Sequence, residues 1–355
     1  MTPTLPLPFG DEIFWLLSLS IVVVVISAAS LTLAAVVLRV RNNRVARRWA
    51  ALEAAWDPLM LAVLAGDRPP GDLARTVAVA DARQFLTYLV RYARRVKGRD
   101  RAVLQQFAEP YLPLALAELR DRRAERRAAA AQVLGELGPQ TYRTQLVGAL
   151  EDPAPLVVVI AAEALARDYA PEHAPALLDR LARLELWTVR FLVSMLQRMG
   201  PESAWMFRDA LADAARPVRL RTIAANVLAV FNDLPAGDIA AHALDGADDT
   251  DLRVALIRLI DRVGTADHVP LLRRLVADPV PAVRGAAIRA LATLGGDAEA
   301  ALIGRAIDDD SHWVAIHAVR ALRKLGQGEL LATLIAHGHH RASAIHEVLA
   351  PESTG

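Results

Sequence analysis

The chain of 355 residues carries 41 Lys and Arg against 40 Asp and Glu, and 54% of its residues are hydrophobic while only 5% are aromatic. Ala and Leu, both strong helix formers, are abundant, so the composition favours an all-α protein. The sequence contains no cysteine, which excludes a disulfide framework, thiolate metal sites and a cysteine nucleophile.

The first predicted element is a membrane-spanning helix. From Ile13 to Leu38 there are 26 consecutive residues without a charge. A helix of that length spans about 39 Å, more than the roughly 30 Å hydrocarbon core of a bilayer. The residues before it include no Lys or Arg, unlike a signal peptide, and the small residues that would suit a cleavage site, at 27–30, lie in the middle of the segment. We therefore predict a tail over 1–12 and a transmembrane helix over 13–40.

Basic residues follow the span directly. Residues 39–127 hold 19 Lys and Arg against 10 Asp and Glu, whereas residues 1–38 hold two acidic residues and no base. The positive-inside rule then places the N-terminal tail outside and everything after Leu38 in the cytoplasm. The arginines next to the span are expected to lie at the membrane surface and to contact anionic lipid; they are Arg39, Arg41, Arg44, Arg47 and Arg48.

A basic helical adaptor is predicted over residues 41–119. Gly and Pro residues divide it into three helices, expected over 44–65, 73–97 and 100–119, the last interrupted near Pro110 and Pro113. Trp49 fits either the membrane interface or the protein core. The basic cluster over 91–101 fits a solvated helix end or a contact with lipid or a partner.

The rest of the chain repeats itself. Windows of 18 residues that share one pattern recur at spacings of 31 or 32 residues, over 121–138, 152–169, 183–200, 215–232, 247–264, 278–295 and 309–326. Most contain a polar or Pro-containing turn, then an apolar residue often followed by Arg, small residues, an apolar stripe and a closing Gly or polar residue. The glycines at 138, 200, 264, 295 and 326 suit a left-handed helix cap. The sequence between windows supplies a second helix, and such pairs bury their apolar faces by stacking into a solenoid.

The windows resemble HEAT-like repeats of the short class first described in phycobilisome lyases, as in DPVPAVRGAAIRALATLG over 278–295. The resemblance implies an all-α fold, in which a right-handed α-solenoid of about seven repeats over 120–350 follows the transmembrane helix. It also implies that polar residues at fixed window positions form ladders along the stack, which mainly join neighbouring repeats and otherwise bind a partner. These ladder residues are Asp152, Arg221, Arg253, Asp278, Arg284 and Asp309.

Histidines near the C-terminus are the main candidates for chemistry. His337, His339, His340 and His346 lie close together in sequence, and His312 and His317 precede them by one repeat. Imidazoles at such density suggest a metal site. However, His339 and His340 are adjacent and would diverge on a helix, so a solvated end cap is the favoured interpretation. The three aspartates at 308–310 are interpreted as a turn with an N-cap.

The sequence contains no phosphate-binding Gly-rich loop and no nucleophile elbow. Residues 128–355 hold 22 Lys and Arg against 28 Asp and Glu, which disfavours nucleic-acid binding. We therefore expect a non-enzymatic scaffold without a cofactor that binds a protein partner. The alternatives are a metal-dependent enzyme that uses the C-terminal histidines and a sensor that binds a small ligand.

The whole layout resembles bacterial membrane-anchored HEAT proteins, in which a single span is followed by a basic Arg-Trp helix, here Arg47-Arg48-Trp49 with Asp57-Pro58-Leu59 after it. Such proteins are often associated with membrane glycosyltransferases of polysaccharide export. The resemblance therefore implies the bacterial inner membrane as the location, a cytoplasmic C-terminal domain, and a partner that is itself membrane-embedded.

Overall fold

The computed structural model describes residues 10–69, 71–168, 174–185 and 187–349. Within these ranges the regular structure is entirely helical. The chain divides into two compact units, residues 1–110 and 111–355, which are described in turn. The predicted tail over 1–12 falls largely outside the described residues.

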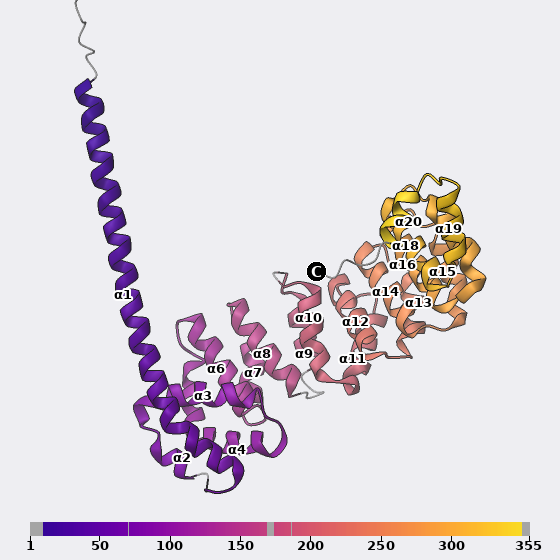
Figure 1. Ribbon diagram of the computed structural model, residues 1–355. Helices are drawn as coiled ribbons and strands as arrows, with labels where there is room; N and C mark the ends of the chain where they lie inside the picture. Colours follow the sequence, from indigo (N-terminus) through magenta and orange to yellow (C-terminus); the bar gives the residue numbers. More distant parts are fainter. Residues whose placement is uncertain (1–9, 70, 169–173, 186, 350–355) are drawn as a thin grey trace, which may run out of the picture. The chain divides into compact units, whose positions relative to one another are not determined.

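Unit 1 begins with one very long helix, α1 (Gly10–Ala65), of 56 residues. At a rise of about 1.5 Å per residue its axis is about 84 Å long. The sequence predicted a span over 13–40 and a separate helix over 44–65, but α1 continues through residues 41–43 without a break (Figure 1). The reason is local, because the linking residues Arg41, Asn42 and Asn43 include neither Gly nor Pro.

The C-terminal part of α1 packs into a small aromatic core. Trp56, Met60 and Val63 are buried at helical spacing, and the Trp56 ring meets the rings of Phe85 and Tyr88 at centroid distances of 5.2 and 5.3 Å. Both aromatic partners belong to α3 (Ala82–Ala93). The core therefore holds α1 against α3 by buried aromatic area.

The helix predicted over 73–97 is in fact broken. Unit 1 contains α2 (Gly71–Thr76), a 3-10 turn η1 (Val79–Asp81), α3, and then α4 (Gly98–Ala108) with η2 (Glu109–Tyr111). The break begins after Thr76, at Val77, and both are β-branched residues that lose side-chain freedom in a helix. Residues 94–97 are also non-helical, so the basic run ends α3 and does not extend it.

Unit 2 is a solenoid of two helix rows, which we call the inner row and the outer row. The inner row is α6 (Ala124–Leu137), α8 (Pro155–Arg167), α10 (Val189–Leu196), α12 (Val218–Phe231), α14 (Thr250–Val263), α16 (Pro281–Leu294), α18 (His312–Lys324) and α20 (Ala342–Leu349). The outer row is α5 (Leu112–Glu118), α7 (Arg143–Ala149), α9 (Ala174–Ala182), α11 (Ala204–Ala212), α13 (Ala236–Leu244), α15 (Val269–Leu275), α17 (Ala300–Arg305) and α19 (Gly328–Ala336). Short 3-10 turns precede or follow several of them: η4 (Gln197–Met199), η5 (Pro201–Ser203), η6 (Ala266–His268), η7 (Gly296–Glu299) and η8 (Ala306–Asp308).

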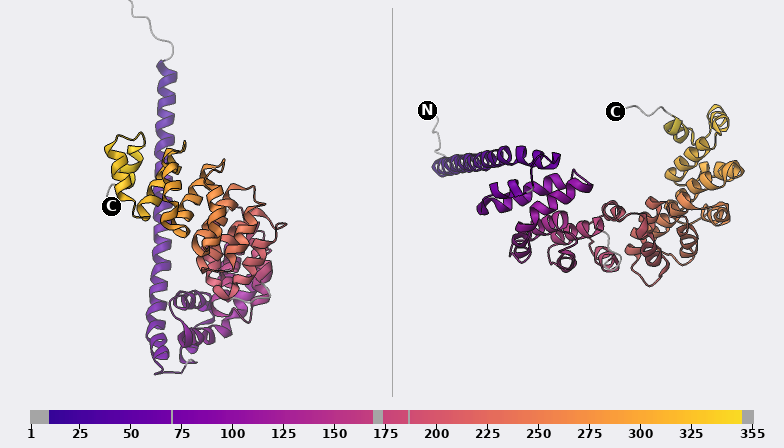
Figure 2. Two further views of the ribbon diagram at one scale, coloured as in Figure 1. Left: turned by 90° about the vertical axis from the view of Figure 1, so that its right-hand side faces the viewer. Right: turned by 90° about the horizontal axis from the view of Figure 1, so that it is seen from below.

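Each helix of the inner row contacts the next one, from α6 to α8 and onward to α20. Figure 2 shows the pairs following one another along the unit. Each of the seven sequence windows contains one inner-row helix. The predicted all-α solenoid is therefore confirmed, and it arises because a helix pair buries its apolar side only against its neighbours.

Small residues allow the close packing of the inner row. A Cβ on Gly135 in α6 would lie 2.2 Å from the Cβ of Ala164 in α8. Of the five glycines expected to form left-handed caps, Gly326 and Gly200 have a positive φ, of 73° and 82°, although the ψ of 163° at Gly200 lies outside the left-handed helical region. The other three end their helices in ordinary backbone. There, a side chain would collide with a neighbour, as at Gly295, where a Cβ would lie 2.3 Å from Glu299 Cγ.

Candidate interaction surface

Three arginines of the inner row each pair with an aspartate 25 residues later in the chain. Arg284 places Nε and Nη2 at 2.7 Å from the two carboxylate oxygens of Asp309. Arg127 pairs with Asp152 in the same two-bonded way, at 2.7 and 2.8 Å. Arg253 likewise donates twice to Asp278. Each pair joins one inner helix to the turn that begins the next, and two-bonded pairs of this kind are geometrically specific.

The same aspartates also shape their own turns. Asp309 accepts the N–H of Ser311 at 2.8 Å, and Asp278 accepts the N–H of Val280 at 2.9 Å. Arg284 meanwhile donates Nη1 to the carbonyl oxygen of Asp278 at 2.9 Å. From Arg253 to Asp309 the ladder is thus a continuous hydrogen-bonded network. Its arrangement favours a structural role for Asp152, Arg253, Asp278, Arg284 and Asp309.

The pairs also shift the ionisation of the aspartates. Hydrogen bonds from Arg127 hold the pKa of Asp152 below its usual value, against the opposing effect of burial. Burial alone would raise the pKa of Asp309, but the hydrogen bonds from Arg284 and the Ser311 N–H outweigh it and the pKa is lowered. Both carboxylates are therefore stabilised in the charged form at neutral pH.

Arg221 departs from the predicted ladder. It is buried, and its Nε donates to the carbonyl oxygen of Leu211 at 3.3 Å. The window position that would hold its aspartate is Ala247, which has no carboxylate to offer. Conversely, Arg127 was missed by the sequence reasoning, although it holds the same window position as Arg253 and Arg284. Comparing all seven windows at that position would have identified it.

The ladder lapses in the middle of the solenoid, and a groove lies there. A hollow of about 670 Å³ extends over α10, α12 and α14, which lie side by side in the inner row (Figure 1). Val218 and Val230 line it with 44% and 46% of their surface exposed. Its other lining residues are Val189, Arg190, Val193, Arg219, Thr222, Asn226, Asp249, Asp251, Val254, Ala255 and Arg258.

The lining is apolar with charges of both signs. Arg219 and Arg258 lie in it together with Asp249 and Asp251. Arg219 also donates to the carbonyl oxygen of Leu184 at 2.9 Å, which ties α12 to the turn before α10. Exposed valines flanked by charged side chains suit the binding of a polypeptide segment, whose apolar side chains need cover and whose polar groups need partners.

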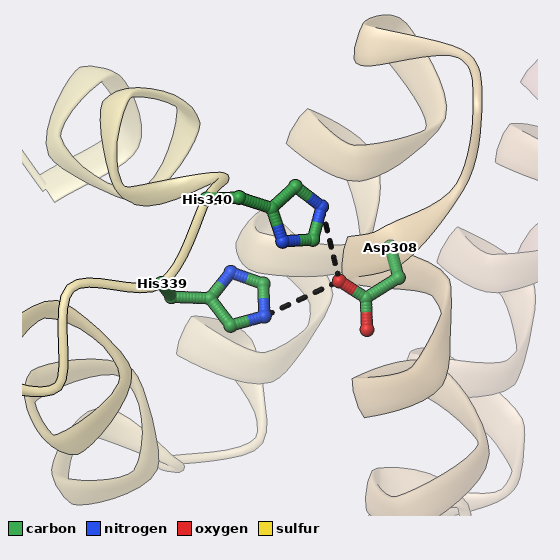
Figure 3. Close-up of side chains that lie close together, drawn as sticks. All are labelled: Asp308, His339 and His340. Carbon is green, nitrogen blue, oxygen red and sulfur yellow. Dashed lines mark ion pairs between the residues drawn. The ribbon is translucent and has the colours of Figure 1, made fainter.

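Two of the four candidate histidines converge on one carboxylate. The Nε2 atoms of His339 and His340 lie 3.2 and 3.4 Å from Asp308 Oδ1, and the two rings stack at a centroid distance of 4.6 Å (Figure 3). The expectation that they diverge on a helix was wrong. They lie in the turn between α19 and α20, where Gly338 has a φ of 64°.

The hydrogen bonding of His339 fits a structural contact between the α19–α20 turn and Asp308 better than a metal site. Its Nδ1 accepts the backbone N–H of Arg341 at 3.2 Å, so the proton of the neutral ring is on Nε2, facing Asp308. A metal ion at Nε2 would displace that proton and leave the Arg341 N–H facing a protonated nitrogen. Metal-binding histidines normally donate from their other nitrogen.

The remaining histidines lie elsewhere. His337 bonds through Nδ1 to the carbonyl oxygen of Thr333 at 2.8 Å, and His346 is exposed on α20. His312 lies 3.5 Å from Glu347, and His317 packs against Trp313. The structure therefore brings together His339 and His340, with Asp308 as the partner that sequence spacing alone did not indicate.

The juxtamembrane arginines follow α1 in unit 1. Arg39, Arg41, Arg44 and Arg47 are exposed along the helix. Arg48 forms an ion pair with Asp81. Their contact with anionic lipid stays a prediction.

Trp49 has a protein neighbour in unit 1. The Arg91 guanidinium lies 5.7 Å from the Trp49 ring centroid and 2.5 Å from Glu53. This cation–π contact gives Trp49 a role within the unit.

The comparison with known families agrees with this architecture. A family model described as HEAT repeats matches residues 112–197 and 238–323. Two segments of unit 2 are therefore similar to HEAT repeats, and unit 2 is an all-α solenoid, an architecture that generally mediates protein interactions. Between the two matched segments lie α11 and α12, in the part of the solenoid where the ladder lapses. No curated protein matches the chain.

Proposed function

We propose that the protein is a non-enzymatic, membrane-anchored scaffold whose central groove binds a protein partner. The observation that carries this proposal is the groove over α10, α12 and α14, which exposed valines line next to the interruption of the ladder. A groove in a stacked-helix scaffold offers a long, rigid surface for a polypeptide, so little conformational freedom of the scaffold is lost on binding.

Helix α1 supplies the anchor in this proposal. The helical stretch over Ser18–Ala65 includes a segment apolar enough to cross a membrane, and that segment is entirely exposed in the structure. Large apolar side chains such as Leu19, Ile26 and Leu33 are exposed over more than half of their surface. Exposure of so much contiguous apolar surface to water is energetically unfavourable, and a bilayer would cover it.

The orientation follows from the arginines after the span. With Arg39, Arg41 and Arg44 on the cytoplasmic side, the solenoid lies in the cytoplasm beneath the membrane. The resemblance to bacterial membrane-anchored HEAT proteins favours the inner membrane. It also favours a membrane-embedded partner, such as a glycosyltransferase of polysaccharide export.

The groove is tested by capture of the partner. Tagged full-length chain, solubilised from its native membranes, is expected to co-purify with a discrete protein. Replacing both Val218 and Val230 by Glu should reduce that capture at least about tenfold, because two charges would enter the apolar lining. Leu234→Glu is the matched control, since Leu234 is 73% exposed and is not among the groove-lining residues. Equal capture by the groove variant and the wild type would refute the groove as the binding site.

The orientation is tested by labelling. Because the chain has no cysteine, Glu329→Cys introduces a single thiol at an exposed position of α19. An impermeant maleimide should label it only after the cells are opened. Labelling in intact cells would contradict the cytoplasmic assignment without bearing on the groove.

A further inference from the structure

The C-terminal part of the inner row is basic. Helices α16 and α18 contain no Asp or Glu, whereas they contain four arginines and Lys324. Arg284 is used in the ladder and Arg323 donates to the carbonyl oxygen of Val348 at 2.9 Å. The side chains that remain are Arg289 on α16 and, one helical turn apart on α18, Arg320 and Lys324.

These positions continue the groove. Arg258 lines the groove on α14, and Arg289 and Arg320 hold the same window position on α16 and α18, at steps of 31 residues. Because the repeats stack in order, equivalent window positions lie on the same face of the inner row. The surface that binds the partner in the proposed function therefore extends toward α18 and becomes basic.

Several of these cations have no carboxylate partner among the described residues. Arg258 and Arg320 are exposed. Lys324 donates to the neutral hydroxyl of Thr293 at 2.7 Å, which leaves its charge uncompensated. Arg289 is the exception, since it pairs with Asp261 at 2.9 Å. Arg258, Arg320 and Lys324 therefore give this part of the inner row a local excess of positive charge.

An exposed aromatic ring lies among these cations. Trp313 is 48% exposed and packs over the backbone of Gly285, where any Cβ would lie 2.3 Å from the indole Cζ3 atom. His317 contacts the same ring at a centroid distance of 4.1 Å. Burial, and then the charges of Arg289 and Arg320, lower the pKa of His317. The indole and the arginines therefore share one surface, in which positive charge is close enough to affect a neighbouring imidazole.

We propose that this basic inner surface, made of Arg258, Trp313, His317, Arg320 and Lys324, binds an acidic segment of the partner protein. Carboxylates of the segment would pair with Arg258, Arg320 and Lys324, and an apolar side chain next to them would cover Trp313. The proposal rests on the proposed scaffold function and adds to it the chemistry of the bound segment. Charge complementarity of this kind steers association and selects partners.

A short acidic peptide fits this surface better than a nucleic acid. Residues 128–355 hold 22 Lys and Arg against 28 Asp and Glu, so a long polyanion would meet net repulsion beyond the patch. A peptide segment touches only the local cations and also supplies an apolar side chain for the indole.

The test uses full-length chain in detergent and fluorescence anisotropy. The probes are a short labelled peptide rich in Glu with one central Phe, the same peptide with Gln in place of Glu, the Glu peptide with Ala in place of Phe, and a single-stranded DNA of matched charge. We expect the Glu–Phe peptide to bind at low salt, at least about tenfold more tightly than the Gln peptide, and more weakly at high salt.

Charge reversal localises the site. Arg258→Glu combined with Arg320→Glu should weaken the Glu–Phe peptide at least about tenfold. The matched control is Arg274→Glu with Arg305→Glu, which makes the same charge change at exposed positions of the outer helices α15 and α17 and should change affinity less than about twofold. Trp313→Ala should weaken the Glu–Phe peptide and leave the Phe-free peptide unchanged.

Three results would overturn the proposal: equal binding of the Glu and Gln peptides, equal losses in the two charge-reversal pairs, or binding of the DNA with none of the peptide. Circular dichroism of each variant excludes loss of fold as the cause. Because the peptides replace the natural partner, failure of this test leaves the capture experiment on Val218 and Val230 unaffected. Failure of capture likewise leaves peptide binding to be judged by itself.

Discussion

The C-terminal repeats and the central repeats of the solenoid use the same window positions in different ways. In α14, α16 and α18 the ladder runs without interruption from Arg253 through Asp278 and Arg284 to Asp309. In the centre, Val158 and Val189 stand where an arginine would be, and Ala247 stands where an aspartate would be. The groove opens over α10, α12 and α14, next to these substitutions.

A repeat position therefore serves stability or binding according to the residue that occupies it. Where Arg and Asp pair, the turn and the helix are fixed and their polar groups are satisfied. Where small or apolar residues replace them, the inner row keeps its helices, but Val189 and its neighbours are available to line a groove.

Removing a ladder arginine should destabilise the C-terminal repeats. Arg284→Ala leaves Asp309 largely buried, with 13% of its side chain exposed and without its cationic partner. We expect a loss of about 2 kcal/mol in the opening free energy of α16 and α18, measured by hydrogen exchange. Arg320→Ala is the control, because Arg320 is exposed on α18 and should change stability by less than about 0.5 kcal/mol. Similar losses in both variants would show that the ladder contributes nothing specific.

Introducing an aspartate at position 247 should make the central repeats more stable, because it completes the Arg–Asp pair found in the C-terminal repeats. Ala247 is 9% exposed, the same fraction as Asp278 in the intact ladder, and Arg221 is the arginine one window earlier. Ala247→Asp should raise the opening free energy of α12 by about 1 kcal/mol through a new pair with Arg221. Ala247→Asn, which lacks the charge, should give clearly less. Destabilisation by Asp would mean that the central repeats cannot adopt ladder geometry.

The contribution of Asp309 should disappear in acid. Its pKa is lowered in the folded state, so the stability that it contributes is fully present above the unfolded value of about 4 and is lost as the pH falls through the folded value. The difference between wild type and Arg284→Ala should therefore be constant from about pH 7 to pH 5 and shrink below about pH 4. A difference that persisted at low pH would point to packing of the Arg284 stem as its cause.

The smallest effect is expected at the contact of His339 and His340 with Asp308, in the last repeat, which lacks an Arg–Asp pair. His340→Ala should cost less than about 1 kcal/mol, because His340 is mostly exposed. The hydrogen bond to His339 Nδ1 also leads us to expect no stoichiometric zinc in the purified chain and no change in its melting temperature with a chelator. Stoichiometric metal that is lost in His339→Ala or His340→Ala would instead support the metal-dependent alternative.

The solenoid was predictable because its determinants are local and repeated. The apolar stripe and the closing glycines recur at a fixed spacing, and each acts within its own turn or helix contact. The break after Thr76 had a local signal that was overlooked, in the β-branched residues. The continuity of α1 was not predicted because residues 41–43 contain neither a helix-breaking residue nor any feature that requires the helix to continue.

The sites were less predictable because they depend on non-local contacts. The convergence of His339 and His340 on Asp308 requires the turn at Gly338 to face η8, which no sequence spacing states. The groove lies where window positions that elsewhere hold Arg or Asp hold Val or Ala. This difference is visible only when the windows are compared with one another. The basic inner surface likewise requires Arg258 and Arg320, far apart in sequence, to share one face.

Binding of a partner in the central groove can be tested with a photo-crosslinking amino acid placed at Val230 in the full-length chain, in native membranes. Val230 lines the groove, and Leu234, four residues later, lies outside that lining and serves as the matched position. We predict one discrete protein adduct from position 230 after irradiation and none of the same mass from position 234. The absence of an adduct at 230, or the same adduct from both positions, would contradict a partner bound in the central groove.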